Sequence, residues 1–223
     1  MTCPSFPLGA FLLAAALLPF VSHEGSACEG PKAVREATPK EVRAYFQGKG
    51  MKVLTFFGFS GAGYEDGEAV LAQAAQVLAR YDPKVTLVNI GGTADGIGAV
   101  YRTAKRMGFS TTGIVSTQAK KEKVELSPCV DTVFYVKDAT WGGLLPGTKK
   151  LSPTSSAVVA NSDVMVAFGG GEIARDELSA GRAAGKAVEF HPADMNHQAA
   201  LDKAKKKGLP PPTDFRGAAA TIF

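Results

Sequence analysis

Three glycine-rich stretches could bind a phosphate group. They are FSGAGYEDG (59–67), GGTADGIG (91–98) and GGGEIARDEL (169–178). Each follows a short apolar run and precedes a helical pattern, so each is expected to join a buried strand to the start of a helix. Backbone N–H groups and the helix dipole attract anions at such a junction. Together the three stretches predict a phosphate or carboxylate site, whereas any one alone is equally consistent with tight packing.

The residues expected to contact this ligand are small residues of the loops and polar residues in the first turn of the third helix. Arg175 would pair with a phosphate, while the carboxylates of Glu172 and Asp176 could hold a ribose. Alternatively, the acidic residues complement the helix dipole and Arg175 forms a surface ion pair with one of them. The full set is Ser60, Gly61, Gly91, Gly92, Thr93, Gly96, Gly169, Gly170, Gly171, Glu172, Arg175 and Asp176.

The common motifs of phosphate loops, metal sites and hydrolases do not match this sequence. No Gly-Lys-Ser/Thr follows a glycine loop, and the spacing in 91–98 differs from G-x-G-x-x-G. The histidines, His23, His191 and His197, have no metal-ligand spacing. Ser60 lacks the flanking glycine pattern of a nucleophile elbow and has no identifiable histidine partner. We therefore expect no metal and no cofactor.

The stretch 137–152 (KDATWGGLLPGTKKLS) contains the only tryptophan, Trp141, among glycines. A tryptophan on a long loop near strand ends could stack on a base or close over a ligand. A lone tryptophan can instead cover an edge of the core. Trp141 is therefore a candidate lid.

Short apolar runs alternate with helical patterns along most of the chain. Strands that are apolar almost throughout belong to sheets covered on both faces, and their alternation with helices indicates parallel crossovers. We predict an α/β fold, a single doubly wound, mainly parallel Rossmann-like sheet flanked by helices, over residues 51–196. Its ligand would bind outside the carboxyl ends of the strands. The expected strands are 52–59, 84–90, 111–116, 131–136, 163–168 and 186–190, and the expected helices are 68–81, 97–107, 153–161 and 172–185.

Residues 1–27 have the pattern of an export signal. The run LGAFLLAAALLPFV (8–21) is uncharged and short for a membrane span, and small residues follow it. The preceding residues contain no Lys or Arg, so a cytoplasmic protein beginning at Met51 is the alternative. We expect an exported protein that is periplasmic, secreted or lipid-anchored.

Cleavage after Ala27 would leave Cys28 first, which makes Cys28 a lipidation candidate with a membrane anchor. Simple secretion, with Cys28 and Cys129 free to pair, is the alternative. Residues 28–50 are expected to form a linker and an N-terminal helix, since Thr38 and Glu41 make a capping box. Residues 197–223 are expected to form a C-terminal helix and a tail.

Composition places the chain among ordinary globular proteins. It has 223 residues, of which 45% are hydrophobic and 21% charged, with a formal net charge of +4. The densest basic run, 203–207, lies in a Lys/Ala-rich stretch typical of a solvated helix face. No aromatic or arginine-rich pattern accompanies it, so nucleic-acid binding is not expected.

The order of these motifs resembles the "lonely guy" family of cytokinin-activating phosphoribohydrolases and the wider superfamily of nucleotide-binding Rossmann-like domains. The resemblance spans residues 52–196 and implies a nucleotide-like ligand, a homodimer and, if the chain is a hydrolase, catalysis by Glu177. FGFSGAG stands at the family's first Gly-Ser-Ser loop, and NSDVMVAFGGGEIARDEL at its Ser-Asp strand and P-G-G-x-G-T-x-x-E signature. The matching residues are Ser60, Gly61, Gly91, Gly92, Gly96, Ser162, Asp163, Gly170, Gly171 and Glu177.

The departures from the family concern its phosphate and catalytic residues. Gly169 replaces the signature proline, and Ile173 and Ala174 occupy its Gly-Thr pair. Thr154 and Ser155 stand where the family carries an Arg-Lys pair whose arginine is thought catalytic. Without that cation, charge developing on the sugar during hydrolysis has no evident stabiliser.

Three functions follow as hypotheses. The first is a module that binds a nucleotide or related phosphorylated small molecule without turnover. The second is a diverged phosphoribohydrolase that cleaves the N-glycosidic bond of a nucleoside monophosphate. The third is a partner-binding protein whose cleft is vacant.

Overall fold

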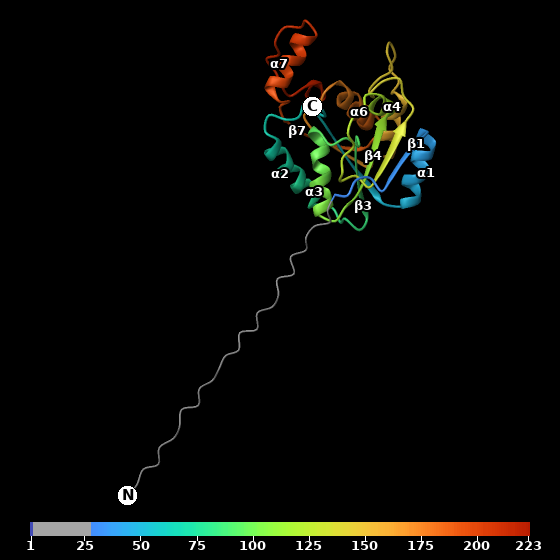
Figure 1. Cartoon of the computed structure of the whole chain (residues 1–223), viewed down its shortest axis with the longest axis vertical. Coiled ribbons are helices and arrows are strands. Elements are labelled where there is room, and N and C mark those ends of the chain that lie inside the picture. The colour runs from blue at the N-terminus through green and yellow to red at the C-terminus, as the bar shows by residue number, and fades with distance from the viewer. Residues whose placement is uncertain (2–27) are drawn as a thin grey trace.

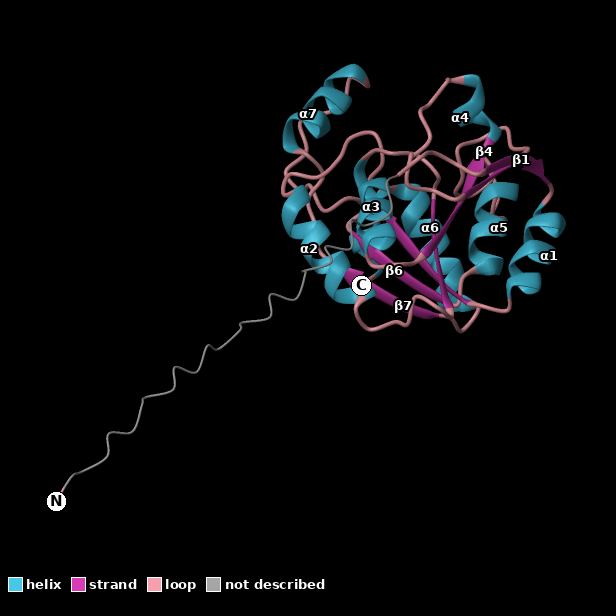
Figure 2. Ribbon diagram, turned by 60° about the horizontal axis from the view of Figure 1, so that its bottom comes forward, coloured by secondary structure: helices cyan, strands magenta, loops and turns pink. Residues whose placement is uncertain are grey.

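A seven-stranded sheet forms the centre of the protein, shown in Figure 1 and Figure 2, and every strand pair in it is parallel. The computed structural model describes Met1 and residues 28–223, so the expected export signal lies outside the described residues. The order across the sheet is β1-β5-β4-β3-β2-β6-β7. The strands are β1 (Ala33–Ala37), β2 (Lys52–Gly58), β3 (Thr86–Ile90), β4 (Ser110–Ser116), β5 (Thr132–Val136), β6 (Val164–Phe168) and β7 (Ala187–His191).

Helices cover both faces of the sheet, which confirms the doubly wound α/β fold. Apolar side chains of α2 and α3 pack on one face, and those of α1, α5 and α6 pack on the other. Figure 2 shows α1 and α5 side by side. The helices are α1 (Pro39–Lys49), α2 (Gly67–Leu78), α3 (Val100–Arg106), α4 (Thr117–Lys121), α5 (Pro153–Asn161), α6 (Glu172–Ala183) and α7 (His197–Lys206), with short 3-10 turns η1 (Gly96–Ala99) and η2 (Ala218–Ile222).

The direction of winding reverses at β2. Strands β3, β4 and β5 follow one another to one side of β2, whereas β6 and β7 lie on its other side. β2 and β6 are neighbours in the sheet, but the loop after β2 leads to α2 on one face and the loop after β6 leads to α6 on the other. The carboxyl edge at such a reversal is where open α/β sheets bind their ligands.

The segment 28–50 contains more than a linker and a helix, because β1 pairs with β5 at the edge of the sheet. The sheet therefore begins at Ala33, and the boundary expected at residue 51 does not separate two units. The strand AVREA has only one large apolar residue, Val34, so its sequence carries no buried-strand signal. The expected α1 is present with its capping box, in which Thr38 N donates to Glu41 Oε2 at 2.7 Å and Glu41 N donates to Thr38 Oγ1 at 3.3 Å.

A disulfide joins Cys28 to Cys129, so the segment before β1 is tied to the loop before β5. The backbone reinforces this link, since Gly30 N donates to Pro128 O at 2.8 Å. Within the described part of the chain, no helix combines the length and the apolar character that crossing a bilayer requires.

Candidate functional site

The three glycine loops meet at the carboxyl edge of the sheet. The loop after β3 touches the loop after β2, because Ile97 N donates to Phe59 O at 2.7 Å. The loop after β2 is bound to the end of β6 through Tyr64, whose hydroxyl donates to Phe168 O at 3.0 Å and accepts from Phe59 N at 3.2 Å. The convergence that the motifs implied is therefore present.

Packing against the chain itself accounts for several of the expected ligand residues. Gly169 lies against the ring of Phe59, and Gly170 O accepts a hydrogen bond from Ala219 N at 2.9 Å. The ring of Phe59 also contacts Gly217 of the C-terminal segment. Gly169 and Gly170 are thus buried beneath an aromatic ring and the C-terminal segment, and they are not open to a ligand.

Gly92 is likewise buried and bonded within the protein, since its N–H donates to the hydroxyl of Tyr101 at 3.1 Å. The Gly92 carbonyl accepts from Ser127 N at 2.9 Å. The remaining expected residues stay at least partly exposed on the rim. Ser60, Gly61, Gly91 and Glu172 are exposed, and Thr93, Gly96, Gly171, Arg175 and Asp176 are half-buried.

The N-terminus of α6 is the part of this rim best suited to an anion. Helices α1, α2, α4, α5 and α7 each have a side chain that accepts from a first-turn amide, and α3 continues from η1. Among the described helices, α6 differs because its N-cap is Gly171, which makes no side-chain cap. The amides at the start of α6 therefore have no side-chain oxygen to bind them.

Exposed apolar side chains lie on the first turn of α6 and on the loop that contacts it. Trp141 is 48% exposed, and Leu144 and Ile173 are each 38% exposed. Gly142 and Gly143 lie against the side chain of Ile173, which brings the Trp141 loop to the first turn of α6. The arrangement places an exposed indole on the loop beside an open helix N-terminus.

Asp176 anchors this loop. Its Oδ2 accepts from Leu144 N at 3.1 Å, and its Oδ1 accepts from Arg175 Nε at 3.0 Å and Nη2 at 2.8 Å. The pairing of Arg175 with a neighbouring carboxylate is the surface ion pair considered as the alternative to phosphate binding. Both carboxylate oxygens of Asp176 are engaged, so its contacts are with the protein.

Glu177 lies below the rim and is 6% exposed. Ser155 Oγ donates to Glu177 Oε1 at 2.6 Å and accepts from Gly143 N at 2.7 Å. Burial raises the pKa of Glu177 to about 7, the hydrogen bond from Ser155 opposes this rise, and the charge of Asp176 adds to it. A carboxyl group with a pKa near 7 could transfer a proton, but the hydrogen-bond partner of Glu177 is the hydroxyl group of Ser155.

The neighbouring threonine is also directed into the protein. Thr154 N donates to Asp138 Oδ2 at 2.9 Å, and Thr140 N donates to Asp138 Oδ1 at 2.8 Å. Burial alone would raise the pKa of Asp138, but these and neighbouring hydrogen bonds hold it below its ordinary value. Thr154 and Ser155 occupy the positions where the resembled family has its Arg-Lys pair. Among the described residues, no lysine or arginine is hydrogen-bonded to Glu177, whose partner is Ser155.

We expect Glu177→Gln to remove a pH dependence from stability. A folded-state pKa of about 7, above the ordinary 4.5, means that the proton stabilises the folded protein below pH 4.5 and that this stabilisation is lost as pH rises through 7. The wild type should lose up to about 3 kcal/mol of unfolding free energy from this group by pH 8. Urea unfolding from pH 5 to pH 8 measures the loss.

Glu172→Gln is the matched control, since Glu172 is exposed on the same helix and should leave the wild-type pH profile unchanged. Equal pH slopes for the wild type and Glu177→Gln would show that Glu177 is not the buried acid described.

No metal centre is evident in the described residues, since no group of three or more His, Cys, Asp or Glu side chains is placed to hold an ion. Sequence reasoning missed the aromatic pair of Phe59 and Tyr64 and the C-terminal segment as elements of this rim. The aromatic residues on both sides of the first glycine loop were the available signal.

No protein-family model and no curated protein matches this chain. Among solved structures, the chain is similar to the structural genomics target TM1055, with 21% identity, a TM-score of 0.46 and coverage of 62% of this chain and 72% of that chain. It is also similar to the molybdenum cofactor carrier protein of Chlamydomonas reinhardtii, with 19% identity, a TM-score of 0.45 and coverage of 77% of this chain and 96% of that chain. A third similar structure is the molybdenum cofactor binding protein of the phototrophic bacterium Rippkaea orientalis, with 18% identity, a TM-score of 0.48 and coverage of 71% of this chain and 85% of that chain. The Rossmann-like arrangement that the sequence predicts is shown by the parallel sheet of this chain and the helices on both its faces.

Proposed function

We propose that the chain binds a nucleotide or a related phosphorylated small molecule at the N-terminus of α6, without turnover. The open N-terminus beside the exposed Trp141 is the observation that carries this proposal. A phosphate would accept hydrogen bonds from the first amides of α6, where the helix dipole also favours negative charge. A flat base would stack on the indole of Trp141.

Binding without turnover is favoured over hydrolysis by the surroundings of Glu177. Its carboxyl group is paired with Ser155, and the neighbouring Thr154 is bound to Asp138 through its amide. Departure of a base needs a cation or a proton donor that meets the substrate. Thr154 and Ser155 provide no cation, and the carboxyl group of Glu177 is buried below the rim. The alternative, a diverged phosphoribohydrolase, predicts that free base appears when the protein is incubated with nucleoside monophosphates.

A pair of substitutions at Gly171 tests the proposed anion site. Space is open around a Cβ at Gly171, and its φ of −85° suits any residue. Both Gly171→Asp and Gly171→Ala should fold, because an aspartate can cap α6 and an alanine at this position should cost no more than about 1 kcal/mol of stability. Gly171→Asp places a carboxylate at the first amides of α6, where the phosphate would bind, whereas Gly171→Ala adds no oxygen, leaves these amides open and is the control.

Thermal shift with adenosine monophosphate, adenosine and inorganic phosphate provides the measurement. At about 100 times the dissociation constant, a ligand adds about 2.7 kcal/mol of stability. We expect adenosine monophosphate to stabilise the wild type and Gly171→Ala but not Gly171→Asp, and Trp141→Ala to weaken its binding more than that of phosphate. Equal stabilisation of the two Gly171 variants would contradict the proposal, as would a wild type that no phosphorylated compound stabilises.

Chromatography of the same mixtures separates binding from hydrolysis. Release of free adenine by the wild type that is lost in Glu177→Gln would establish the hydrolase alternative. Nucleotide binding without base release would favour the binding module.

We further propose that the protein is exported. A disulfide between Cys28 and Cys129 is expected to persist in an oxidising compartment, which supports this proposal. Because the disulfide uses the thiol of Cys28, it leaves no thiol there for a lipid and favours simple secretion over the lipid anchor. Mass spectrometry of protein from the native host, alkylated without reduction, should find Cys28 and Cys129 linked; a lipidated Cys28 or two free thiols would overturn the proposal.

A further inference from the structure

A cavity bounded by Lys32, Lys49, Lys105, Ser110 and Thr132 lies at the amino edge of the sheet, opposite to the glycine loops. Ser110 begins β4 and Thr132 begins β5. The volume of this amino-edge cavity is about 280 Å³. Sites for drug-sized ligands commonly have volumes of roughly 300–1,000 Å³, so the amino-edge cavity suits a smaller molecule.

Three lysines and one aspartate line the amino-edge cavity, and the aspartate is already paired. Lys105 Nζ donates to Asp131 Oδ1 at 2.8 Å and to Asp131 Oδ2 at 3.1 Å. Lys32 and Lys49 form no ion pair with another described residue. Two ammonium groups at the cavity therefore have no carboxylate partner.

The charges around the cavity preserve this positive excess. Arg35 Cζ lies 5.6 Å from the centre of the Tyr45 ring, which also lines the cavity, and Lys49 Nζ lies 5.3 Å from the same ring centre. Lys49 and Lys105 belong to the last turns of α1 and α3. Each helix C-terminus is equivalent to roughly half a negative charge, so the two together offset only about one of the positive charges.

Hydroxyl groups add hydrogen-bond donors to the lining. Thr132 is 8% exposed, and its Oγ1 accepts from Tyr45 Oη at 3.4 Å. Among the described residues, the Thr132 hydroxyl donates to no acceptor, so its hydrogen is available to an oxygen of a ligand. Ser110 contributes an exposed hydroxyl.

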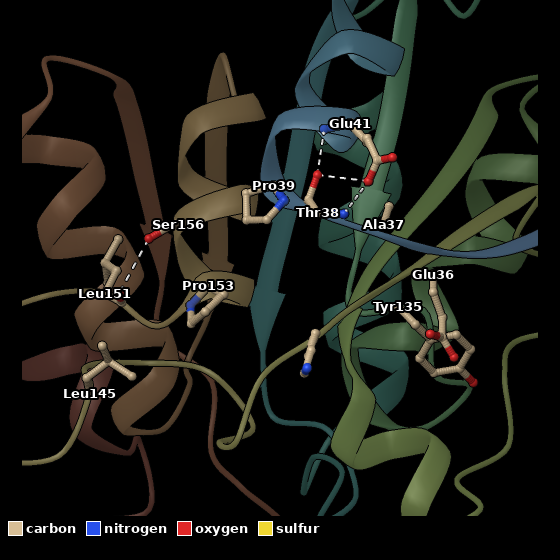
Figure 3. A pocket seen from close by; sticks show the side chains of 11 residues that line it. Glu36, Ala37, Thr38, Pro39, Glu41, Tyr135, Leu145, Leu151, Pro153 and Ser156 are labelled. Atoms are coloured by element: carbon tan, nitrogen blue, oxygen red, sulfur yellow. Dashed lines mark hydrogen bonds between the residues drawn. The ribbon is translucent and has the colours of Figure 1, made fainter.

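The larger hollow between α1 and α5, shown in Figure 3, has no excess of positive charge. Glu36, Glu41 and Lys137 line it, and Lys120 pairs with Glu36, so acidic and basic side chains are equal in number there. Charge therefore selects no class of ligand for that hollow, whereas it selects an anion for the amino-edge cavity.

We propose that the amino-edge cavity binds a small dianion, either a phosphate monoester or a dicarboxylate, at the ammonium groups of Lys32 and Lys49. Both kinds of molecule offer two negative charges on oxygens that accept from lysine and hydroxyl donors. The inference does not depend on the proposed function, because Gly171 lies at the opposite edge of the sheet.

Titration with succinate and with glycerol 3-phosphate, followed by NMR of the backbone amides, tests the location. Signals of Lys32, Ser110 and Thr132 should shift with at least one of the two dianions, and the one that acts identifies the ligand as a dicarboxylate or a phosphate monoester. The shifts should be equal in the wild type and in Gly171→Asp, whose carboxylate occupies the anion site of α6. Failure of nucleotide binding at α6 is thereby distinguished from failure at the amino-edge cavity.

Neutral and cationic counterparts of these probes test the charge. Succinamide and glycerol lack the negative charges of the two dianions, and diaminobutane resembles succinate in length but carries two positive charges. None of the three should shift the same signals measurably. Added salt should weaken binding of the dianion, because Lys32 and Lys49 are exposed to solvent.

Substitutions then test the two lysines. Lys32→Gln and Lys49→Gln should each weaken binding of the dianion about fivefold, as expected for the loss of one exposed ion pair. Lys84→Gln is the matched control, since Lys84 is an exposed lysine at the same edge of the sheet but does not line the cavity. Its affinity for the dianion should equal that of the wild type.

The absence of any shift, or shifts confined to Gly61 and Gly171, would overturn the proposal. An equal response to succinate and diaminobutane would do so too, as would a Lys32→Gln/Lys49→Gln variant that binds the dianion as the wild type does. A loss of affinity in Lys84→Gln as large as in the other two variants would indicate only the general attraction of a basic surface and would likewise exclude the site.

Discussion

Gly96→Ala is expected to destabilise the protein by about 2–5 kcal/mol. Gly96 has a φ of +55°, in the left-handed region that costs L-residues energy. A Cβ added there would also overlap the carbonyl oxygens of Phe59 and Ser60 in the neighbouring loop. Both penalties act on the junction of the loops after β2 and β3, so the midpoint of urea unfolding should fall clearly.

Gly91→Ala in the same loop is the matched control. A Cβ at Gly91 meets no atom within 4 Å, and its φ lies outside the left-handed region. Its unfolding midpoint should stay close to that of the wild type or rise slightly, since alanine restricts the unfolded chain. If Gly96→Ala unfolds at the same urea concentration as Gly91→Ala, the two loops do not meet as described.

Removal of the disulfide should have an effect of similar size. The bond joins residues separated by 101 positions, and closing a loop of that length restricts the unfolded chain by roughly 4.7 kcal/mol in the entropic account. We expect Cys28→Ala/Cys129→Ala to lose about 3–5 kcal/mol of unfolding free energy. Alanine is chosen because Cys129 is buried and a serine there would add a polar group.

A reductant separates the bond from other effects of the substitutions. Reduction should lower the urea midpoint of the wild type towards that of the double variant and leave the double variant unchanged. A wild type whose midpoint does not respond to complete reduction would show that the bond contributes little to stability.

The central strands and several helices were predictable because their signals are local. The expected strand 163–168 is β6, found at Val164–Phe168, and the expected helix 153–161 is α5, found at Pro153–Asn161. The strand is apolar throughout, and the helix begins with a serine cap followed by proline. β1 was not predicted, because a short strand with one large apolar residue is indistinguishable from a linker in the sequence.

For the site, the meeting of the loops was predictable and the covering of part of them was not. Parallel strands place their carboxyl ends at one edge, so the loops after β2, β3 and β6 were expected to share that edge. That they are neighbours follows from the strand order β3-β2-β6. That Gly170 is covered by Ala219 depends on where the C-terminal segment packs, and no local pattern encodes that contact. The bond between Ser155 and Glu177 is similarly long-range, and it gives the buried carboxyl group a structural partner.

The weak apolar character of β1 also bears on solubility. β1 is an edge strand, and its outer backbone groups could recruit a strand from another chain into a growing aggregate. Its short length and the exposed charged side chains of Arg35 and Glu36 oppose such recruitment. The same five residues that are hard to recognise as a strand therefore protect this edge of the sheet against self-association.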